Sequence, residues 1–250
     1  MEDHVRIECC VDSVHAAQLA MRNADRLEVC SRLTQGGYTP GLELLDAVLE
    51  LCEFFPACNV FAMVRPWCGG KEDFVYASGE ERDALNRDLD AMVSRPVHGI
   101  VVGALIRDGN GLLDVDTDTI GRICRVADGK NIAALTFHRA FDDIDADRIK
   151  SIEKLGGFGL ITRILTSGGR GLKSQVTDDG NLEEISRYRQ VAGERGISIL
   201  PGSGIGPENA AQVVRWTGCR EIHGSFGAGT LVMAVRASLR EVCKQVTATR

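Results

Sequence analysis

The chain has 250 residues, of which 44% are hydrophobic and 26% are charged, a composition that is ordinary for a globular protein. A net charge of −6 and a pI near 5.5 argue against a general nucleic-acid-binding surface, which would be basic. No run approaches the roughly 20 apolar residues of a membrane span. The polar start, MEDHVRIE, lacks the pattern of a secretory signal, so we expect a cytoplasmic protein.

Eight strand-like runs alternate with helical segments along the chain. These runs are VRIECC (5–10), RLEVC (26–30), NVFAMVR (59–65), GIVVGAL (99–105), IAALTFHR (132–139), LITRILTS (160–167), ISILPGSG (197–204) and REIHGS (220–225). Between them apolar residues recur three and four positions apart, for example over 41–55 and 81–93, which predicts helices. Helix starts are indicated at Asp12-Ser13, Thr39-Pro40 and Gly206-Pro207.

This alternation predicts parallel strands joined by right-handed crossovers. Eight such units in 250 residues are typical of a (β/α)8 TIM barrel. An open doubly wound sheet is the alternative, but it would normally carry a glycine-rich turn after the first strand, where this chain reads CCVDS. We therefore predict a single TIM-barrel domain over residues 1–250.

The C-terminal ends of the predicted strands are unusually polar. Residues two apart in a strand share a face, so Glu8 lies with Cys10 and Glu28 with Cys30, while Cys9 should point outward to the helices. Charges inside a barrel are costly unless they are paired, so this concentration of charge predicts a pocket at the C-terminal end. Its expected members are Glu8, Glu28, Arg65, His138 and His223.

The segment PGSGIGPEN, after the seventh predicted strand, suggests an anion site. The free N–H groups of Gly202, Ser203 and Gly204 would face the anion, and the helix predicted to start at Pro207 would add its positive end. Arg65 is expected to bind a carboxylate or phosphate through two hydrogen bonds. A plain tight turn is the alternative for this segment, and a basic loop, 168–173, is expected beside it.

The order of motifs resembles that of the CutC family of copper homeostasis proteins. They are ECCVDS, ADRLEVCS, QGGYTPG, MVRPWCGG, GIVVGAL, TFHRAFD, RILTSG, PGSGI and EIHGS, from residue 8 to residue 225. The resemblance implies a TIM barrel, a cytoplasmic homo-oligomer and a role in copper tolerance through Cu(I) binding. The family's proposed copper ligands fall here on Cys10 and Cys30.

Two departures from the family pattern lie at the mouth of the expected pocket. Where the family commonly reads RPRGGDF, this chain reads RPWCGGKEDF, so Trp67 replaces an arginine and Cys68, Lys71 and Glu72 enlarge the loop. The segment before the last helix, SFGAGTLVMAV, is also shorter than in many members. Details of substrate or lid are therefore not carried over from the family.

Three functions fit the sequence. The resemblance favours a copper homeostasis protein, and Cu(I) prefers sulfur ligands, although staggered strands would place Cys10 and Cys30 at different depths. The alternative is an enzyme that uses acid–base chemistry on a small anionic substrate, which gives the acids, histidines and Arg65 a role. Its candidate catalytic residues are Glu8, Glu28, His138 and His223. A scaffold without chemistry is the third.

Overall fold

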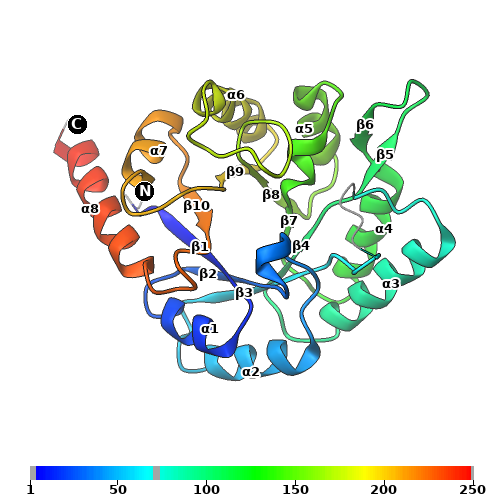
Figure 1. Cartoon of the computed structure of the whole chain (residues 1–250), viewed down its shortest axis with the longest axis horizontal. Helices are drawn as coiled ribbons and strands as arrows, with labels where there is room; N and C mark the ends of the chain where they lie inside the picture. The colour runs from blue at the N-terminus through cyan, green and yellow to red at the C-terminus, as the bar shows by residue number, and fades with distance from the viewer. Residues whose placement is uncertain (1–3, 70–73, 249–250) are drawn as a thin grey trace.

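A ring of parallel strands surrounded by helices forms the centre of the molecule (Figure 1). The computed structural model describes residues 4–69 and 74–248, so Lys71 and Glu72 lie outside the described residues. The barrel strands are β1 (Arg6–Val11), β2 (Arg26–Val29), β3 (Asn59–Met63), β4 (Gly99–Val102), β7 (Leu135–Phe137), β8 (Ile161–Thr166), β9 (Ser198–Pro201) and β10 (Glu221–Gly224). The helices are α1 (Val14–Ala20), α2 (Leu42–Cys52), α3 (Gly79–Val93), α4 (Thr117–Asp128), α5 (Arg148–Gly156), α6 (Asn181–Glu194), α7 (Ala210–Thr217) and α8 (Val232–Ala248).

The strand order β10-β1-β2-β3-β4-β7-β8-β9 confirms the predicted TIM barrel. Every predicted strand overlaps an observed one, and all neighbours in this order pair in parallel. β9 and β10, the two ends of the order, lie side by side and complete the ring (Figure 1). No helix in the described ranges is both long enough and apolar enough to cross a membrane.

One hairpin was not expected from the sequence. β5 (Leu105–Arg107) and β6 (Leu113–Val115) pair antiparallel and project from the barrel after β4 (Figure 1). In their turn, the Asp108 carboxylate accepts hydrogen bonds from the N–H groups of Asn110, at 2.8 Å, and Leu112, at 2.9 Å. The sequence DGNG between two short apolar runs is a hairpin signal that could have predicted this element.

The observed helix starts differ from the predicted ones by different numbers of residues. Ser13 is the N-cap of α1, and its Oγ accepts a hydrogen bond from Ala16 N at 3.2 Å. α2 begins at Leu42, two residues after Pro40. α7 begins only at Ala210, because a turn comes first in which Asn209 Oδ1 accepts the Gly206 N–H at 2.9 Å. The positive end of α7 is therefore further from the β9 loop than the sequence suggested.

Aromatic and charged side chains share the interior of the barrel. The Phe61 ring lies between the guanidinium groups of Arg26, 5.2 Å from the ring centroid, and Arg163, 4.7 Å from it. Gly99 leaves the room that this ring occupies, since a Cβ there would overlap the ring. Cys9, as predicted, faces outward and belongs to the apolar core between strands and helices.

We expect Gly99→Ala to destabilise the protein by about 1–3 kcal/mol, because the new methyl group would collide with Phe61 and with the Ala134 carbonyl oxygen. Gly79→Ala is the matched control: its Cβ would meet nothing within 4 Å at the start of α3, where alanine favours the helix. Urea unfolding would measure both. Equal stability of the two variants would contradict the crowded interior.

Candidate active site

A cavity of about 370 Å³ opens at the C-terminal ends of the barrel strands. Its polar wall is formed by Cys10, Glu28, Arg65, His138, Arg139, Ser203 and His223, and its apolar wall by Leu33, Met63, Phe74, Leu165, Leu172 and Ile205. Of the five charged residues expected to share a pocket, Glu28, Arg65, His138 and His223 do line the cavity.

Arg65 presents a fixed cation to the cavity. Its Nη1 donates hydrogen bonds to the carbonyl oxygens of Gly36 and Gly37, both at 3.0 Å. Its guanidinium carbon lies over the rings of Tyr38, at 4.4 Å from the centroid, and Phe74, at 4.6 Å. Nη2 is buried and has no partner among the described residues, so one nitrogen is left for a ligand.

His138 adds a second unpaired donor. Its Nδ1 accepts a hydrogen bond from Ala140 N at 3.1 Å, which places the proton of the neutral ring on Nε2. Burial, and then the charge of Arg65, lowers the pKa of His138 to about 3, so the ring stays neutral. Nε2 is buried without a partner within the described part of the chain. Gly103 makes room for this ring, since a Cβ there would overlap it.

Trp67, which departs from the family pattern, is connected to Arg65 through the ring of Tyr38. Its ring packs edge-on against Tyr38, with centroids 4.9 Å apart, and the guanidinium of Arg32 stacks on it at 4.3 Å. Trp67 is 47% exposed and does not line the cavity. The substitution therefore reaches the site through Tyr38, which itself stacks on Arg65.

Glu8 lies beneath the cavity rather than on its wall, which corrects the expectation from the sequence. The strand register places Glu8 opposite Arg26, one layer below the pair Cys10 and Glu28. Its carboxylate accepts a hydrogen bond from Arg26 Nε and lies 2.7 Å from His223 Nδ1. Although burial alone would raise the pKa of Glu8, the charge of Arg26 and the His223 contact hold it well below its ordinary value.

Arg26 was missed by the sequence reasoning. Its Nη2 donates to Glu221 at 2.6 Å, so the guanidinium bridges two buried carboxylates, those of Glu8 and Glu221. The alternation that put Glu28 on the inner face of β2 also puts Arg26 there, two residues earlier. Arg26 could therefore have been found from the same signal.

Cys10, Glu28 and His223 form the wall above Glu8. One ligand atom from each lies within 4.8 Å of the others, and all three side chains are buried. Burial raises the pKa of Glu28 to about 7 and raises that of the Cys10 thiol. Burial would lower the pKa of His223, but Glu28 and Glu8 more than offset this and raise it. Glu28 Oε2 has no partner among the described atoms.

Cys30 lies apart from this wall. It is fully buried in a small apolar cluster with Phe61, Met63 and Val101, and it does not line the cavity. Cys10 stands opposite Glu28 in the register, and Cys30 lies two residues after Glu28, just past the end of β2. A copper site that uses Cys10 and Cys30 together stays a prediction.

The loop after β9 meets the anion-site expectation only in part. The sequence predicted a free N–H at Gly202, but this N–H donates a hydrogen bond to the Thr166 carbonyl oxygen at 3.0 Å. Ser203 and Gly204 line the cavity with φ of +78° and +74°, an uncommon conformation for the serine. Within the described structure neither of their N–H groups donates a hydrogen bond, so two donors remain at this edge.

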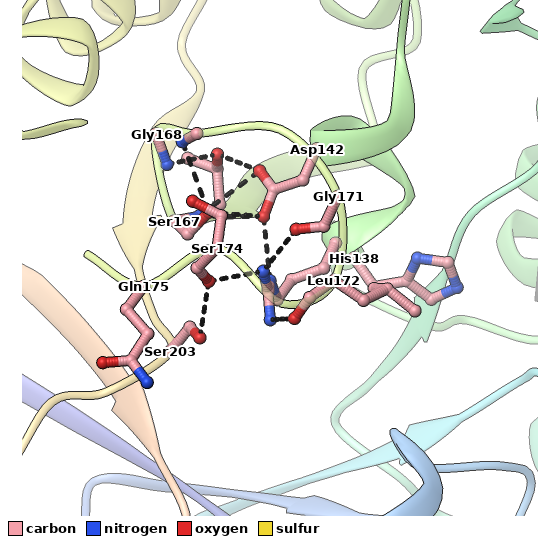
Figure 2. A network of polar contacts seen from close by, with 12 residues as sticks. His138, Asp142, Ser167, Gly168, Gly171, Leu172, Ser174, Gln175 and Ser203 are labelled. Carbon is pink, nitrogen blue, oxygen red and sulfur yellow. Dashed lines mark hydrogen bonds and ion pairs between the residues drawn. The ribbon is translucent and has the colours of Figure 1, made fainter. Parts of the chain in front are cut away.

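A buried carboxylate, Asp142, organises the loop after β8 (Figure 2). It accepts hydrogen bonds from Ser167 Oγ at 2.9 Å, from Ser167 N at 3.1 Å, from Arg139 Nε at 2.8 Å and from Thr166 Oγ1. Arg139 in turn donates to the carbonyl oxygens of Gly171, Leu172 and Ser174.

These contacts hold the basic loop over 168–173 in place and put Leu172 on the cavity wall. The Ser174 carbonyl oxygen also accepts from Ser203 Oγ at 2.9 Å, which joins the β8 and β9 loops. Arg139 and Asp142 belong to the motif TFHRAFD, in which only His138 was predicted from the sequence to be a site residue.

Comparisons of the sequence with known proteins point to one family. Residues 5–228 match the CutC family. A CutC family protein of Caulobacter vibrioides is 36% identical over 224 residues, 89% of this chain and 82% of that one. One from Histophilus somni is 32% identical over 218 residues, 87% and 80% of the two chains.

Solved structures show the same fold. The CutC protein of Streptococcus agalactiae superposes with a TM-score of 0.76 at 28% identity, covering 89% of this chain and 99% of that one. Thiamine phosphate pyrophosphorylase from Pyrococcus furiosus has a TM-score of 0.61 at 12% identity, covering 95% and 96%, which indicates a shared fold alone.

His138 should make stability depend on pH. It stays neutral in the folded protein down to a pKa of about 3, whereas the unfolded chain protonates it near 6.5. Between these values the unfolded state binds the additional proton, so stability is complete above pH 6.5 and falls as the pH drops towards 3. One such group changes the unfolding free energy by at most about 1.4 kcal/mol per pH unit.

His138→Gln keeps hydrogen-bonding groups at this position but does not titrate. We therefore expect the variant to lose part of this acid dependence, as measured by denaturant unfolding at several pH values. A slope that is unchanged in the variant would show that His138 is not buried neutral.

Proposed function

This chain belongs to the CutC family, and from that premise we propose that its cavity binds a small organic anion and performs acid–base chemistry on it. One observation carries the proposal: Arg65 Nη2, His138 Nε2 and Glu28 Oε2 are buried, unpartnered among the described residues, and belong to side chains that line one cavity. A buried polar atom without a partner costs about 1–3 kcal/mol, so three around one space indicate a site built for a ligand.

The size and charge of the cavity define the class of ligand. Small-molecule sites enclose roughly 300–1,000 Å³, and this cavity, at about 370 Å³, is at the lower end of that range. Arg65 is cationic and His138 is neutral, so this side offers one positive charge and two N–H donors. A carboxylate matches both. The N–H groups of Ser203 and Gly204 offer a second place for a phosphate or a polar oxygen.

The proposed reacting groups come from β2 and β10. Glu28 and His223 bring a carboxyl group and an imidazole to the cavity, the side-chain types that proton transfer requires. Glu8 does not line the cavity but fixes the ring of His223, so it acts as a positioning residue. The anion at Arg65 and His138 would hold the substrate against these reacting groups.

A second candidate function is Cu(I) binding. The Streptococcus agalactiae relative is named for copper homeostasis, and Cys10 lines the cavity of this chain. Cu(I) prefers sulfur ligands, which Cys10 and Cys30 on adjacent strands would supply. This function leaves Arg65, His138 and Glu28 without a role, so we rank it second. For either function we propose that the protein is cytoplasmic and forms a homo-oligomer. Light scattering would test the oligomeric state.

Anion binding should depend on Arg65. Isothermal titration with a panel of small carboxylates and phosphorylated compounds should identify ligands that lose at least about tenfold in affinity in Arg65→Lys, because lysine lacks the planar guanidinium. Arg170→Lys is the control, because Arg170 is exposed and does not line the cavity. Ligands that bind both variants equally well would contradict the proposed function.

Copper binding should depend on cysteines. If Cu(I) binds through the pair, Cys10→Ser combined with Cys30→Ser should abolish stoichiometric binding, and Cys9→Ser should not, since Cys9 faces the helices. Competition with a chromogenic Cu(I) chelator would measure this. Full binding by the double variant would rule out the pair and direct attention to Cys68, which is only half-buried.

A further inference from the structure

We propose that Cys10, Glu28 and His223 bind a zinc ion whose fourth coordination position faces the cavity. The substrate of this site is the small anion of the proposed function, on which this inference rests. The zinc ion is the added component, and it would take part in proton transfer. The thiol sulfur, a carboxylate oxygen and a ring nitrogen lie within 4.8 Å of one another. Zinc bonds of about 2.0–2.3 Å bring tetrahedral ligands to about 3.5 Å from each other, so small side-chain rotations complete the site.

Side chains that would orient the histidine ligand are already in place. Glu8 Oε1 lies 2.7 Å from His223 Nδ1, which leaves Nε2 of the same ring to bind the ion. A histidine that binds a metal almost always donates its other N–H to a carboxylate or carbonyl group, which fixes the tautomer and orients the ring. Glu8 is itself held by Arg26, which is anchored on Glu221 at 2.6 Å.

A second, independent observation concerns the carboxylate of Glu28. Glu28 is only 3% exposed, yet its Oε2 has no hydrogen-bond partner among the described atoms. Buried carboxylate oxygens regularly find a donor or a cation, because leaving one unsatisfied is costly. Cys10 stands directly opposite Glu28 in the β1–β2 register, so a cation that satisfies Glu28 also meets the sulfur.

The mixture of donors selects the metal. Sulfur alone would favour Cu(I), and oxygen alone would favour Mg²⁺ or Ca²⁺. One thiolate, one carboxylate and one imidazole form a borderline set that suits Zn²⁺, and three protein ligands with an open position are the pattern of catalytic zinc. Such an ion lowers the pKa of bound water to about 7, so Glu28 and His223 would act through the ion.

Arg65 and His138 complete this arrangement. They line the same cavity as the three ligands and offer unpaired N–H donors. A carboxylate held there would direct another part of the substrate to the ion. The geometry therefore points to a small carboxylate that also carries an oxygen able to reach the metal, such as a hydroxy or oxo acid.

Metal binding to the full chain tests the inference. Protein stripped with a chelator should bind one Zn²⁺ per chain in isothermal titration, and one Co²⁺ with a sulfur-to-cobalt charge-transfer band. Cys10→Ser should abolish that band, whereas Cys9→Ser and Cys30→Ser should retain it. Glu8→Gln keeps all three ligands and should weaken Zn²⁺ affinity about 10–100-fold, because it weakens the contact that orients the His223 ring. Circular dichroism would establish that each variant is folded.

Several results would overturn the zinc site. They are a folded wild-type protein without stoichiometric Zn²⁺ or Co²⁺ binding, a charge-transfer band that survives Cys10→Ser, and Cu(I) bound through Cys10 and Cys30 in preference to zinc. Anion titrations on the metal-free protein and on Arg65→Lys separate the two proposals. A protein that binds anions but fails to bind zinc overturns only this inference, whereas a protein that binds zinc but none of the anions overturns the proposed function.

Discussion

The buried ion cluster around Arg26 is the interaction on which the site depends. Its guanidinium neutralises Glu8 and Glu221 inside the barrel, where an unpaired carboxylate would cost several kcal/mol. Because Arg26 holds Glu8, the Glu8 carboxylate can orient His223 at the floor of the cavity. The same network that pairs these interior charges also orients a side chain on the cavity wall.

The cavity above this network has two chemically different sides. Arg65 and His138 provide hydrogen-bond donors that are locked by carbonyl oxygens, aromatic rings and a backbone N–H. Cys10, Glu28 and His223 provide groups that can ligate an ion or carry a proton. β3 and β7 lead into the first set, whereas β10, β1 and β2 carry the second, and all five side chains line the same cavity.

Hydrogen bonds also hold the loops that follow the strands at the mouth of the cavity. Asp142 and Arg139 do not carry the proposed chemistry, yet they connect the β7, β8 and β9 loops (Figure 2). Leu172 and Ser203 reach the cavity through these contacts. The motif TFHRAFD therefore combines a histidine that lines the cavity with residues that shape the entrance.

The amino-acid sequence by itself determined the eight strands and the inner faces of β1, β2 and β10, because strand alternation is local and shows in any single run of residues. It did not determine that Glu8 lies below the cavity, that Cys30 lies outside the cavity wall, or that the Gly202 N–H donates to Thr166. Those features depend on the stagger between neighbouring strands and on hydrogen bonds between distant loops. Only the closed barrel sets both, since its register aligns residues that are far apart in the chain.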